Sequence, residues 1–127
     1  SPFLYAGAEG RLEILKLTVA AGADLGSLNR YGGTALIPAA HHGHVETVRY
    51  LLTTSIDVDH VNDLGWTALM EAVILGDGGP VYQKIVDLLL AAGADARIAD
   101  HDGVTPLRHA RSRGQNGIVE SLLRASR

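Results

Sequence analysis

Apolar residues along this chain recur at the spacing of short amphipathic helices that come in pairs. Segment 34–53 carries two such stripes, one of small and one of large side chains: Leu36, Ala39, Ala40, and Val45, Val48, Leu51, Leu52. Residues three or four positions apart share one face of a helix. The pattern predicts a first helix from Ala35 to about His42, capped by Thr34, and a second helix that ends near Thr53.

The same arrangement returns at a fixed period. Thr34 and Thr67 are 33 residues apart, and Gly10, Gly43 and Gly76 follow one another at the same interval. A turn and two helices repeated every 33 residues are typical of a solenoid, whose units bury their apolar faces against their neighbours. We therefore predict an all-α stack of repeats.

The ends of the longer helices differ in their termination signals. Gly22 and Gly93 stand where a helix can end with a left-handed glycine, whereas Ser55 occupies this place in the second unit. A non-glycine residue there is expected to strain that helix end, at a cost of about 1 kcal/mol, or to terminate it differently. At the start of the chain, Ser1 and Pro2 have the residue types of an N-cap and a first helical position.

These motifs, taken in order, resemble the ankyrin repeat: Thr-Ala/Pro-Leu, Ala-Ala, Gly-His, a Leu-Leu pair and Gly-Ala-Asp. The resemblance covers nearly the whole chain as one domain, 1–127. It implies about four helix-turn-helix units joined by β-turn or hairpin fingers. The expected units are a truncated 1–28, complete 29–61 and 62–99, and a closing cap, 100–127.

Two features depart from the family pattern. The histidine that the family places after Thr-Pro-Leu is replaced by Ile37, Met70 and Arg108, which puts its usual hydrogen bonds in question. The third unit also carries five extra residues between Gly76 and Lys84. We interpret Asp77-Gly78-Gly79-Pro80 as a loop between its two helices, because surface loops tolerate insertions.

Composition excludes several functional classes. The chain has no cysteine, so neither a disulfide nor a thiol-based site is available. Residues 1–99 hold six basic and eleven acidic residues and residues 100–127 five and three, a weak gradient that does not favour nucleic acid as a partner. No apolar run reaches the roughly 20 residues that span a bilayer. We expect a soluble protein without membrane insertion, either cytoplasmic or an exported mature form, since the sequence begins without Met as in a trimmed chain.

Catalytic or metal chemistry is not indicated. No phosphate-binding loop, serine elbow or zinc-protease motif is present, so we expect neither enzymatic activity nor a cofactor. The cluster of His41, His42 and His44 suggests a metal, but zinc needs three or four converging ligands. His41 and His42 should diverge by about 100° on a helix, and His44 matches a structural histidine of the family. Metal binding stays a minor alternative.

The resemblance also implies a contact surface, because the family uses its finger tips and first helices as a concave face for partners. Carried across position by position, this face comprises Arg30, Tyr31, Asp63, Leu64, Trp66, His101, Asp102 and Val104 from the turns, and Ala8, Glu9, His41, His42, Ile74, Leu75, Ser112 and Arg113 from the helices.

An apolar patch near the centre of this face is the candidate binding site. Leu64, Trp66, Ile74 and Leu75 fall in the third unit beside Tyr31 of the second, and this composition is typical of an interface hot spot. Its expected polar rim consists of Arg30, Glu71, Asp63 and Asp102. Alternatively, Trp66 folds against the next turn and Ile74 lies between units, which leaves Leu64 and Leu75 partly exposed.

Our interpretation is a non-catalytic module that binds another protein, with inhibition or protection of the partner among its roles. Small bacterial stand-alone members of the family resemble this chain. Two alternatives stay open. The chain is a scaffold segment of a longer protein, which exposure of apolar side chains at the Phe3 and Leu4 end would favour, or it is a monomer that associates weakly with itself through the patch.

Overall fold

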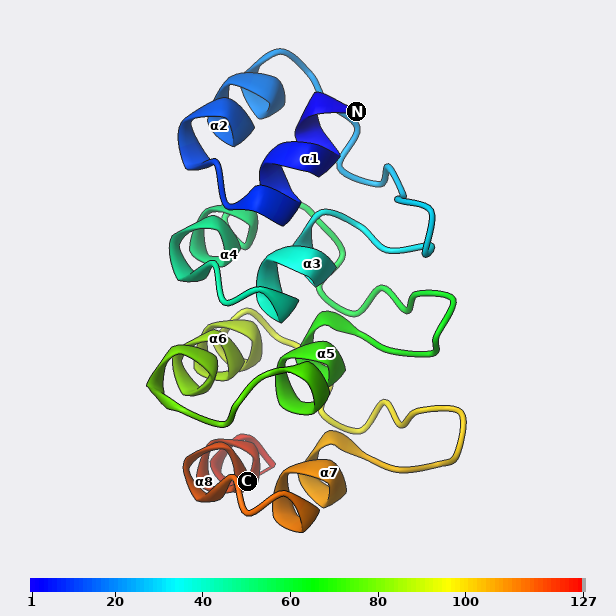
Figure 1. Ribbon diagram of the computed structural model, residues 1–127, viewed down its shortest axis with the longest axis vertical. Helices are drawn as coiled ribbons and strands as arrows, with labels where there is room; N and C mark the ends of the chain where they lie inside the picture. Colours follow the sequence, from blue (N-terminus) through cyan, green and yellow to red (C-terminus); the bar gives the residue numbers. More distant parts are fainter. Residues whose placement is uncertain (127) are drawn as a thin grey trace.

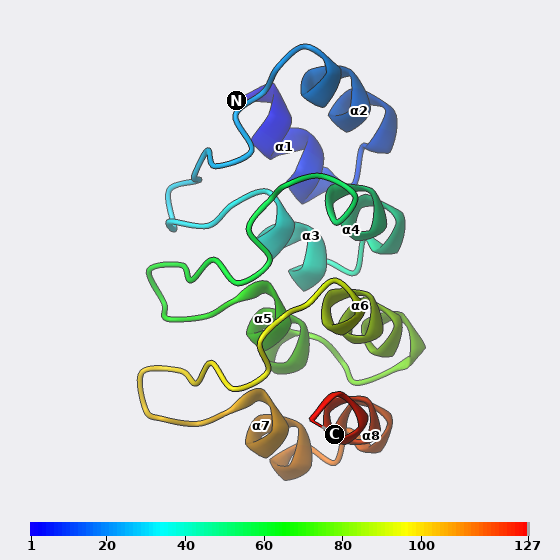
Figure 2. The same ribbon diagram turned by 180° about the vertical axis from the view of Figure 1, so that it is seen from behind.

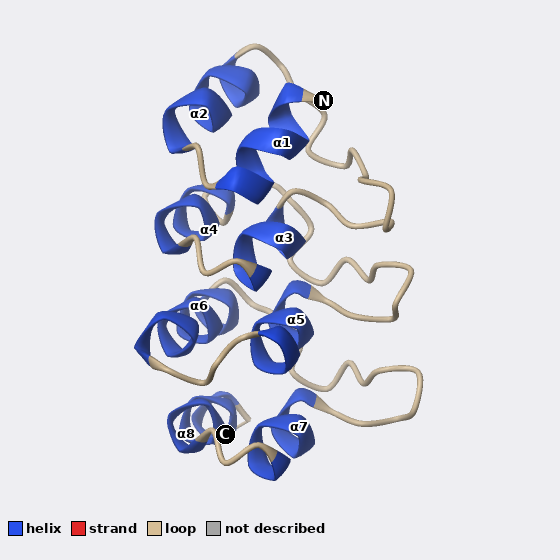
Figure 3. Ribbon diagram, in the orientation of Figure 1, coloured by secondary structure: helices blue, strands red, loops and turns tan. Residues whose placement is uncertain are grey.

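The computed structural model describes residues 1–126, and within them the chain forms eight helices and no strand (Figure 3). The helices are α1 (Pro2–Glu9), α2 (Leu12–Ala20), α3 (Leu36–His41), α4 (Val45–Leu51), α5 (Ala68–Leu75), α6 (Pro80–Ala91), α7 (Pro106–Ser112) and α8 (Asn116–Ala125). The expected all-α solenoid is confirmed.

The helices stand in two rows. The odd-numbered helices form one row and the even-numbered helices the other, and each pair stacks on the pair before it (Figure 1). After each even-numbered helix except α8, the chain leaves the stack as a projecting finger and returns to the next odd-numbered helix (Figure 2). The fingers are closed by turns and lie beside the odd-numbered row.

The core lies between the two rows and between successive pairs. In the odd-numbered row the buried positions include small side chains, such as Ala39, Ala40 and Ala72, which let helices approach closely. In the even-numbered row Leu51 and Leu89 are fully buried. The small and large stripes expected from the sequence are therefore the two sides of one continuous core.

Helix ends follow the sequence signals where glycine is available. Gly22 and Gly93 adopt left-handed φ angles of 91° and 94°, as predicted. The second unit has Ser55 in place of this glycine, and its helix terminates differently, which was the second of the two predicted outcomes. The side chains of Thr53 and Thr54 bond to the last turn of that helix: their hydroxyls donate to the carbonyl oxygens of Tyr50 and Leu51.

The N-caps reveal one wrong prediction. Thr67 and Thr105 accept hydrogen bonds from the amides three residues later, and Ser1 does the same for α1, but the buried Thr34 hydroxyl has no partner in residues 1–126. The reason is Pro38, which lacks the N–H that would bond the Thr34 carbonyl. The amide of Ile37 donates to this carbonyl instead, at 3.3 Å, and so turns away from the hydroxyl.

The loop between the two helices of the third unit ends one residue earlier than predicted. Gly76–Gly79 link α5 to α6, and Pro80 is already the first residue of α6 rather than part of the loop. α6 has 12 residues, whereas α4 has seven. Most of the extra chain thus lengthens a helix, and Pro80 is suited to a first helical position.

Candidate functional site

Each finger is organised by one side chain at its base. Asn29, Asn62 and Asp100 occupy equivalent positions, and the Oδ1 atom of each accepts the backbone N–H groups two and four residues later, at 2.9 to 3.1 Å. Such side-chain turns fix the loop without help from a strand ladder. The fingers are therefore shaped before any partner arrives.

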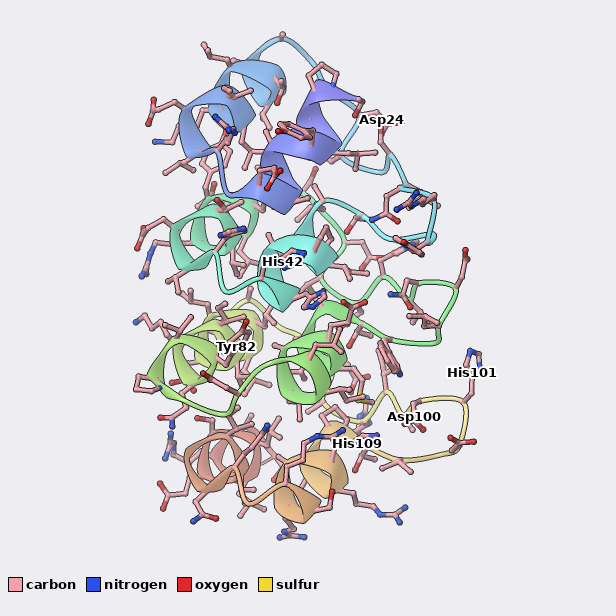
Figure 4. All side chains as sticks on the ribbon, viewed as in Figure 1. Asp24, His42, Tyr82, Asp100, His101 and His109 are labelled. Carbon is pink, nitrogen blue, oxygen red and sulfur yellow. The ribbon has the colours of Figure 1, made fainter. Side chains whose placement is uncertain are left out.

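Neighbouring fingers are also tied to one another. The amide of Asp63 donates to the carbonyl oxygen of Tyr31 at 2.9 Å, and His60 Nε2 donates to that of Gly32 at 2.7 Å. The ring of His101 lies against the backbone of Gly65, where any side chain would collide with it. Figure 4 shows His101 at the tip of the finger between α6 and α7, well away from His109. These contacts hold the three fingers in register.

A groove of about 580 Å³ lies where the first two fingers meet the row of α1, α3 and α5. We call it the Glu71 groove. It is lined by Leu4, Tyr5, Ala8, Asn29, Arg30, Tyr31, Ile37, Pro38, His41, His42, Asn62, Leu64, Glu71 and Leu75.

Glu71 is a buried acid in this otherwise largely apolar groove. Its Oε2 accepts a hydrogen bond from Asn62 Nδ2 at 2.6 Å, and its Oε1 lies 3.6 Å from His41 Nδ1. Two backbone N–H groups already donate to the side-chain Oδ1 of Asn62, so its Nδ2 faces Glu71 and donates to the carboxyl group. Burial raises the pKa of Glu71 to about 7, opposed by the Asn62 hydrogen bond, so the carboxyl group changes charge near neutral pH.

The histidine cluster does not look as expected from helix geometry. The rings of His41 and His42 do not diverge but stack, with centroids 4.2 Å apart and planes 17° from parallel. His42 is the C-cap residue of α3 and lies outside the helix, which allows its ring to stack on that of His41. Burial, and then the proximity of His42, lower the pKa of His41.

His44 has the structural role predicted for it, since its Nε2 donates to the carbonyl oxygen of Ala8 at 3.0 Å. Across residues 1–126 no three His, Asp or Glu side chains are grouped so that they could hold a metal ion. His41 and His42 line the Glu71 groove, whereas His44 bonds to α1.

A second depression, of about 310 Å³, lies one finger further along the stack. We call it the Trp66 hollow, and it is lined by Leu64, Trp66, Ile74, Asp100, His101, Asp102, His109 and Arg113. His109 and Asp100 lie near one another (Figure 4), and His109 Nε2 donates to Asp100 Oδ2 at 2.7 Å. Arg113 donates to His109 Nδ1 at 2.9 Å. The hydrogen bond from His109 lowers the pKa of Asp100.

The residues expected from the sequence are thus divided between two places. Arg30, Tyr31, His41, His42 and Leu75 line the Glu71 groove. Trp66, Ile74, His101 and Asp102 line the Trp66 hollow, with Trp66 and Ile74 half-buried, and Leu64 lines both. Two further members lie apart from them: Asp63 at a finger tip and Val104 beside Arg108.

The sequence analysis missed the buried polar residues of the groove and part of its apolar lining. Asn62, Pro38 and the exposed Tyr5 were not among the candidates, and Glu71 was assigned only to the rim. A signal for the floor was present: Asn62 and Glu71 are nine residues apart, as are Asp100 and His109, so a comparison of the units in register could have revealed both pairs.

The helices of the described chain include none that is long and apolar enough to cross a membrane.

Comparisons with known proteins agree with the geometry. Residues 3–100 match the family model described as ankyrin repeats (3 copies). The chain is 42% identical over 126 residues to the ankyrin repeat protein YahD of Escherichia coli K12, which covers 98% of this chain and 63% of YahD.

Two crystal structures are closely similar. An ankyrin repeat domain from Acinetobacter baumannii AYE superimposes with a TM-score of 0.98 at 63% identity, over 99% of this chain and 64% of that one. The ankyrin repeat protein EF0377 gives a TM-score of 0.93 at 49% identity, over 97% and 63%. This chain therefore spans less than two thirds of the length of these relatives.

Proposed function

This chain belongs to the ankyrin repeat family, and we propose that it binds a partner protein through the Glu71 groove and the fingers beside it. One observation carries the proposal. Tyr31, Leu64 and Leu75 line the same groove although these residues remain 55%, 52% and 40% exposed to solvent. A cluster of exposed apolar side chains in a hollow, with polar groups around it, has the composition of an interface core.

The mechanism is rigid presentation. The side-chain turns at Asn29 and Asn62 and the bonds between fingers fix the backbone of the binding surface. Little conformational entropy is then lost on association, and the shape of the groove selects the partner. Ankyrin repeats in general mediate contacts between proteins and are not catalysts, which supports a binding role over an enzymatic one.

A second candidate function rests on the N-terminal end of the stack, although at α2 and not at Phe3, which is buried, or Leu4, which is half-buried. Ile14 and Leu17 on α2 are 42% and 70% exposed, whereas Thr47, which occupies the position of Ile14 in the next unit, is buried. A neighbouring repeat or a second copy of the chain would cover this end. In this account the chain is a scaffold segment whose apolar end continues the stack.

A pair of matched variants distinguishes the groove from the N-terminal end of the stack as the binding surface. Leu64→Glu places a charge in the groove and Leu17→Glu places the same charge at the end of the stack, and both sites are exposed enough to keep the fold. Each protein is immobilised, exposed to a lysate of the source organism, and its bound proteins are identified by mass spectrometry. Proteins retained by wild type and Leu17→Glu but lost from Leu64→Glu support the groove.

The opposite pattern, loss only in Leu17→Glu, would replace the groove with the end face. Light scattering of wild type and Leu17→Glu then decides between self-association and a heterologous neighbour, because only self-association gives a mass that depends on protein concentration.

A further inference from the structure

One oxygen of Glu71 has no hydrogen-bond donor among residues 1–126. Oε2 accepts a hydrogen bond from Asn62, whereas Oε1 lies 3.6 Å from His41 Nδ1, beyond hydrogen-bond distance. A carboxylate has about four acceptor sites, and a buried one is costly unless it is paired. The side chain is only 7% exposed, but it lines the groove, so a group that enters the groove can reach it.

The walls beside this oxygen suit an aliphatic stem. Pro38, Leu64 and Leu75 are apolar, and Tyr5 and Tyr31 add two aromatic rings. Lysine and arginine side chains bury their methylene groups along apolar surface while the charged head seeks a partner. Cations are also attracted to aromatic faces, as Arg30 already shows by lying 5.0 Å from the ring centre of Tyr31.

We propose that the Glu71 groove receives a lysine or arginine side chain of a partner protein, flanked by apolar residues, and pairs its cationic head with the Glu71 carboxylate. This inference rests on the proposed function and specifies the chemistry of the partner. Residues 1–99, which supply every residue that lines the groove, contain six basic and eleven acidic residues, and the net negative charge of this part of the chain favours a basic segment over an acidic one.

Other ionisable groups of the groove do not cancel this preference. Arg30 is exposed and held over Tyr31 at the finger, and His41 and His42 stack on each other at the rim. Burial raises the pKa of Glu71 to about 7, and an incoming cation would favour the ionised form.

The equivalent positions in the neighbouring units do not offer an acid. Thirty-three residues earlier stands Pro38, and thirty-eight residues later stands His109, both of whose ring nitrogens are bonded. The preference for a basic side chain is therefore specific to the third unit, which fixes the position of the partner along the stack.

The test uses a phage library of random 12-residue peptides selected against the whole chain. Wild type is compared with Glu71→Gln, which removes the charge and keeps the shape, and with Glu46→Gln, which removes an exposed charge on α4. Selection by wild type and Glu46→Gln should enrich peptides that carry lysine or arginine between apolar residues, and Glu71→Gln should lose this enrichment. Circular dichroism confirms that each variant is folded.

A double substitution then measures the contact itself. The strongest peptide is synthesised with its lysine replaced by norleucine, or its arginine by citrulline, and dissociation constants are measured by calorimetry. With wild type this replacement should weaken binding by about tenfold or more, and with Glu71→Gln it should change binding less than about twofold.

Several results would overturn the inference. If selected peptides lose binding in Leu64→Glu but show neither basic enrichment nor coupling to Glu71, the groove binds a segment of other chemistry and the proposed function survives. Peptides insensitive to both Leu64→Glu and Glu71→Gln would remove both proposals. A selection that enriches no peptide would also count against the groove as a site for a basic segment.

Discussion

The second and third fingers, which open the third and fourth units, share one construction and differ in charge. Asn62 and Asp100 close their fingers with the same pair of backbone hydrogen bonds, and each bonds the side chain nine residues later. In the third unit that residue is the acid Glu71, and in the fourth it is His109. The same backbone thus presents an acid in one place and a base in the next.

The two pairs also differ in how completely they are satisfied. His109 donates to Asp100 and accepts from Arg113, so both ring nitrogens are used within the fourth unit. Glu71 is buried with a single hydrogen bond. A group satisfied by its own unit stabilises the fold, whereas one that is buried and incompletely bonded costs stability and is available to a ligand. The comparison separates a pair that is satisfied within the fold from a pair that, in our proposal, a partner completes.

The largest expected effect is the loss of stability on truncation of Leu89, which tests the alignment of the third unit with the fourth. Leu89 and Leu122 are equivalent residues 33 positions apart, and both are buried. α6 packs against α4, α5 and α8, whereas α8 packs against α6 and α7. Leu89→Ala should lower the free energy of unfolding by about 2 to 5 kcal/mol, and Leu122→Ala by less. Urea unfolding measures both, and an unchanged midpoint for Leu89→Ala would contradict the register.

The next effect concerns Asn62. Asn62→Ala removes two bonds to the backbone and leaves Glu71 without its donor, which should cost about 2 to 4 kcal/mol. Asn29→Ala is the matched control, because Asn29 makes the same two backbone bonds but has Pro38 in place of the acid. The difference between the variants in urea unfolding reports the bond to Glu71. Equal losses would mean that this bond contributes nothing to stability.

Glu71 should make the stability of the third unit depend on pH between about 4.5 and 7. Its folded pKa of about 7 lies above its ordinary value of 4.5, so the folded state holds more protons between these values and stability falls as pH rises through this window. Glu71→Gln should therefore be more stable than wild type by roughly 1 to 3 kcal/mol at pH 8 and similar to it at pH 4. Thermal melts at the two pH values measure this, and a constant difference would contradict the assignment.

The smallest effect has the opposite sign and belongs to the fourth unit. The hydrogen bond from His109, and then that from the Val104 amide, hold the pKa of Asp100 below its ordinary value of 3.8. Its contribution to stability is complete above this value and is lost as pH falls through the folded pKa. Asp100→Asn should lose less stability than wild type between pH 4 and pH 2, measured by thermal melts. A steeper loss in the variant would exclude this role.

Local features of the fold were predictable wherever one residue type decides the outcome. The glycines at 22 and 93 and the cap at Ser1 act within a few residues of themselves, and the sequence predicted them correctly. Thr34 was predicted wrongly because Pro38, one turn later, withdraws the amide on which the ordinary cap geometry depends.

The candidate site was less predictable because it joins residues from three units. Tyr31, Leu64 and Leu75 were identified from the family's contact positions, but Trp66 and Ile74 lie in a separate hollow. The divergence of His41 and His42 was wrong because it assumed that the helix continues through His42.

By itself, the sequence determined the period of 33 residues, the alternation of small and large apolar stripes and the turns, and with them the paired helices and their stacking order. These features follow from contacts within a unit or between successive units, which a repeating sequence repeats. Only the tertiary structure decided that Glu71 is buried beneath an exposed apolar groove. Burial depends on which side chains from α1, α3 and two fingers converge on one point, and no local pattern specifies that.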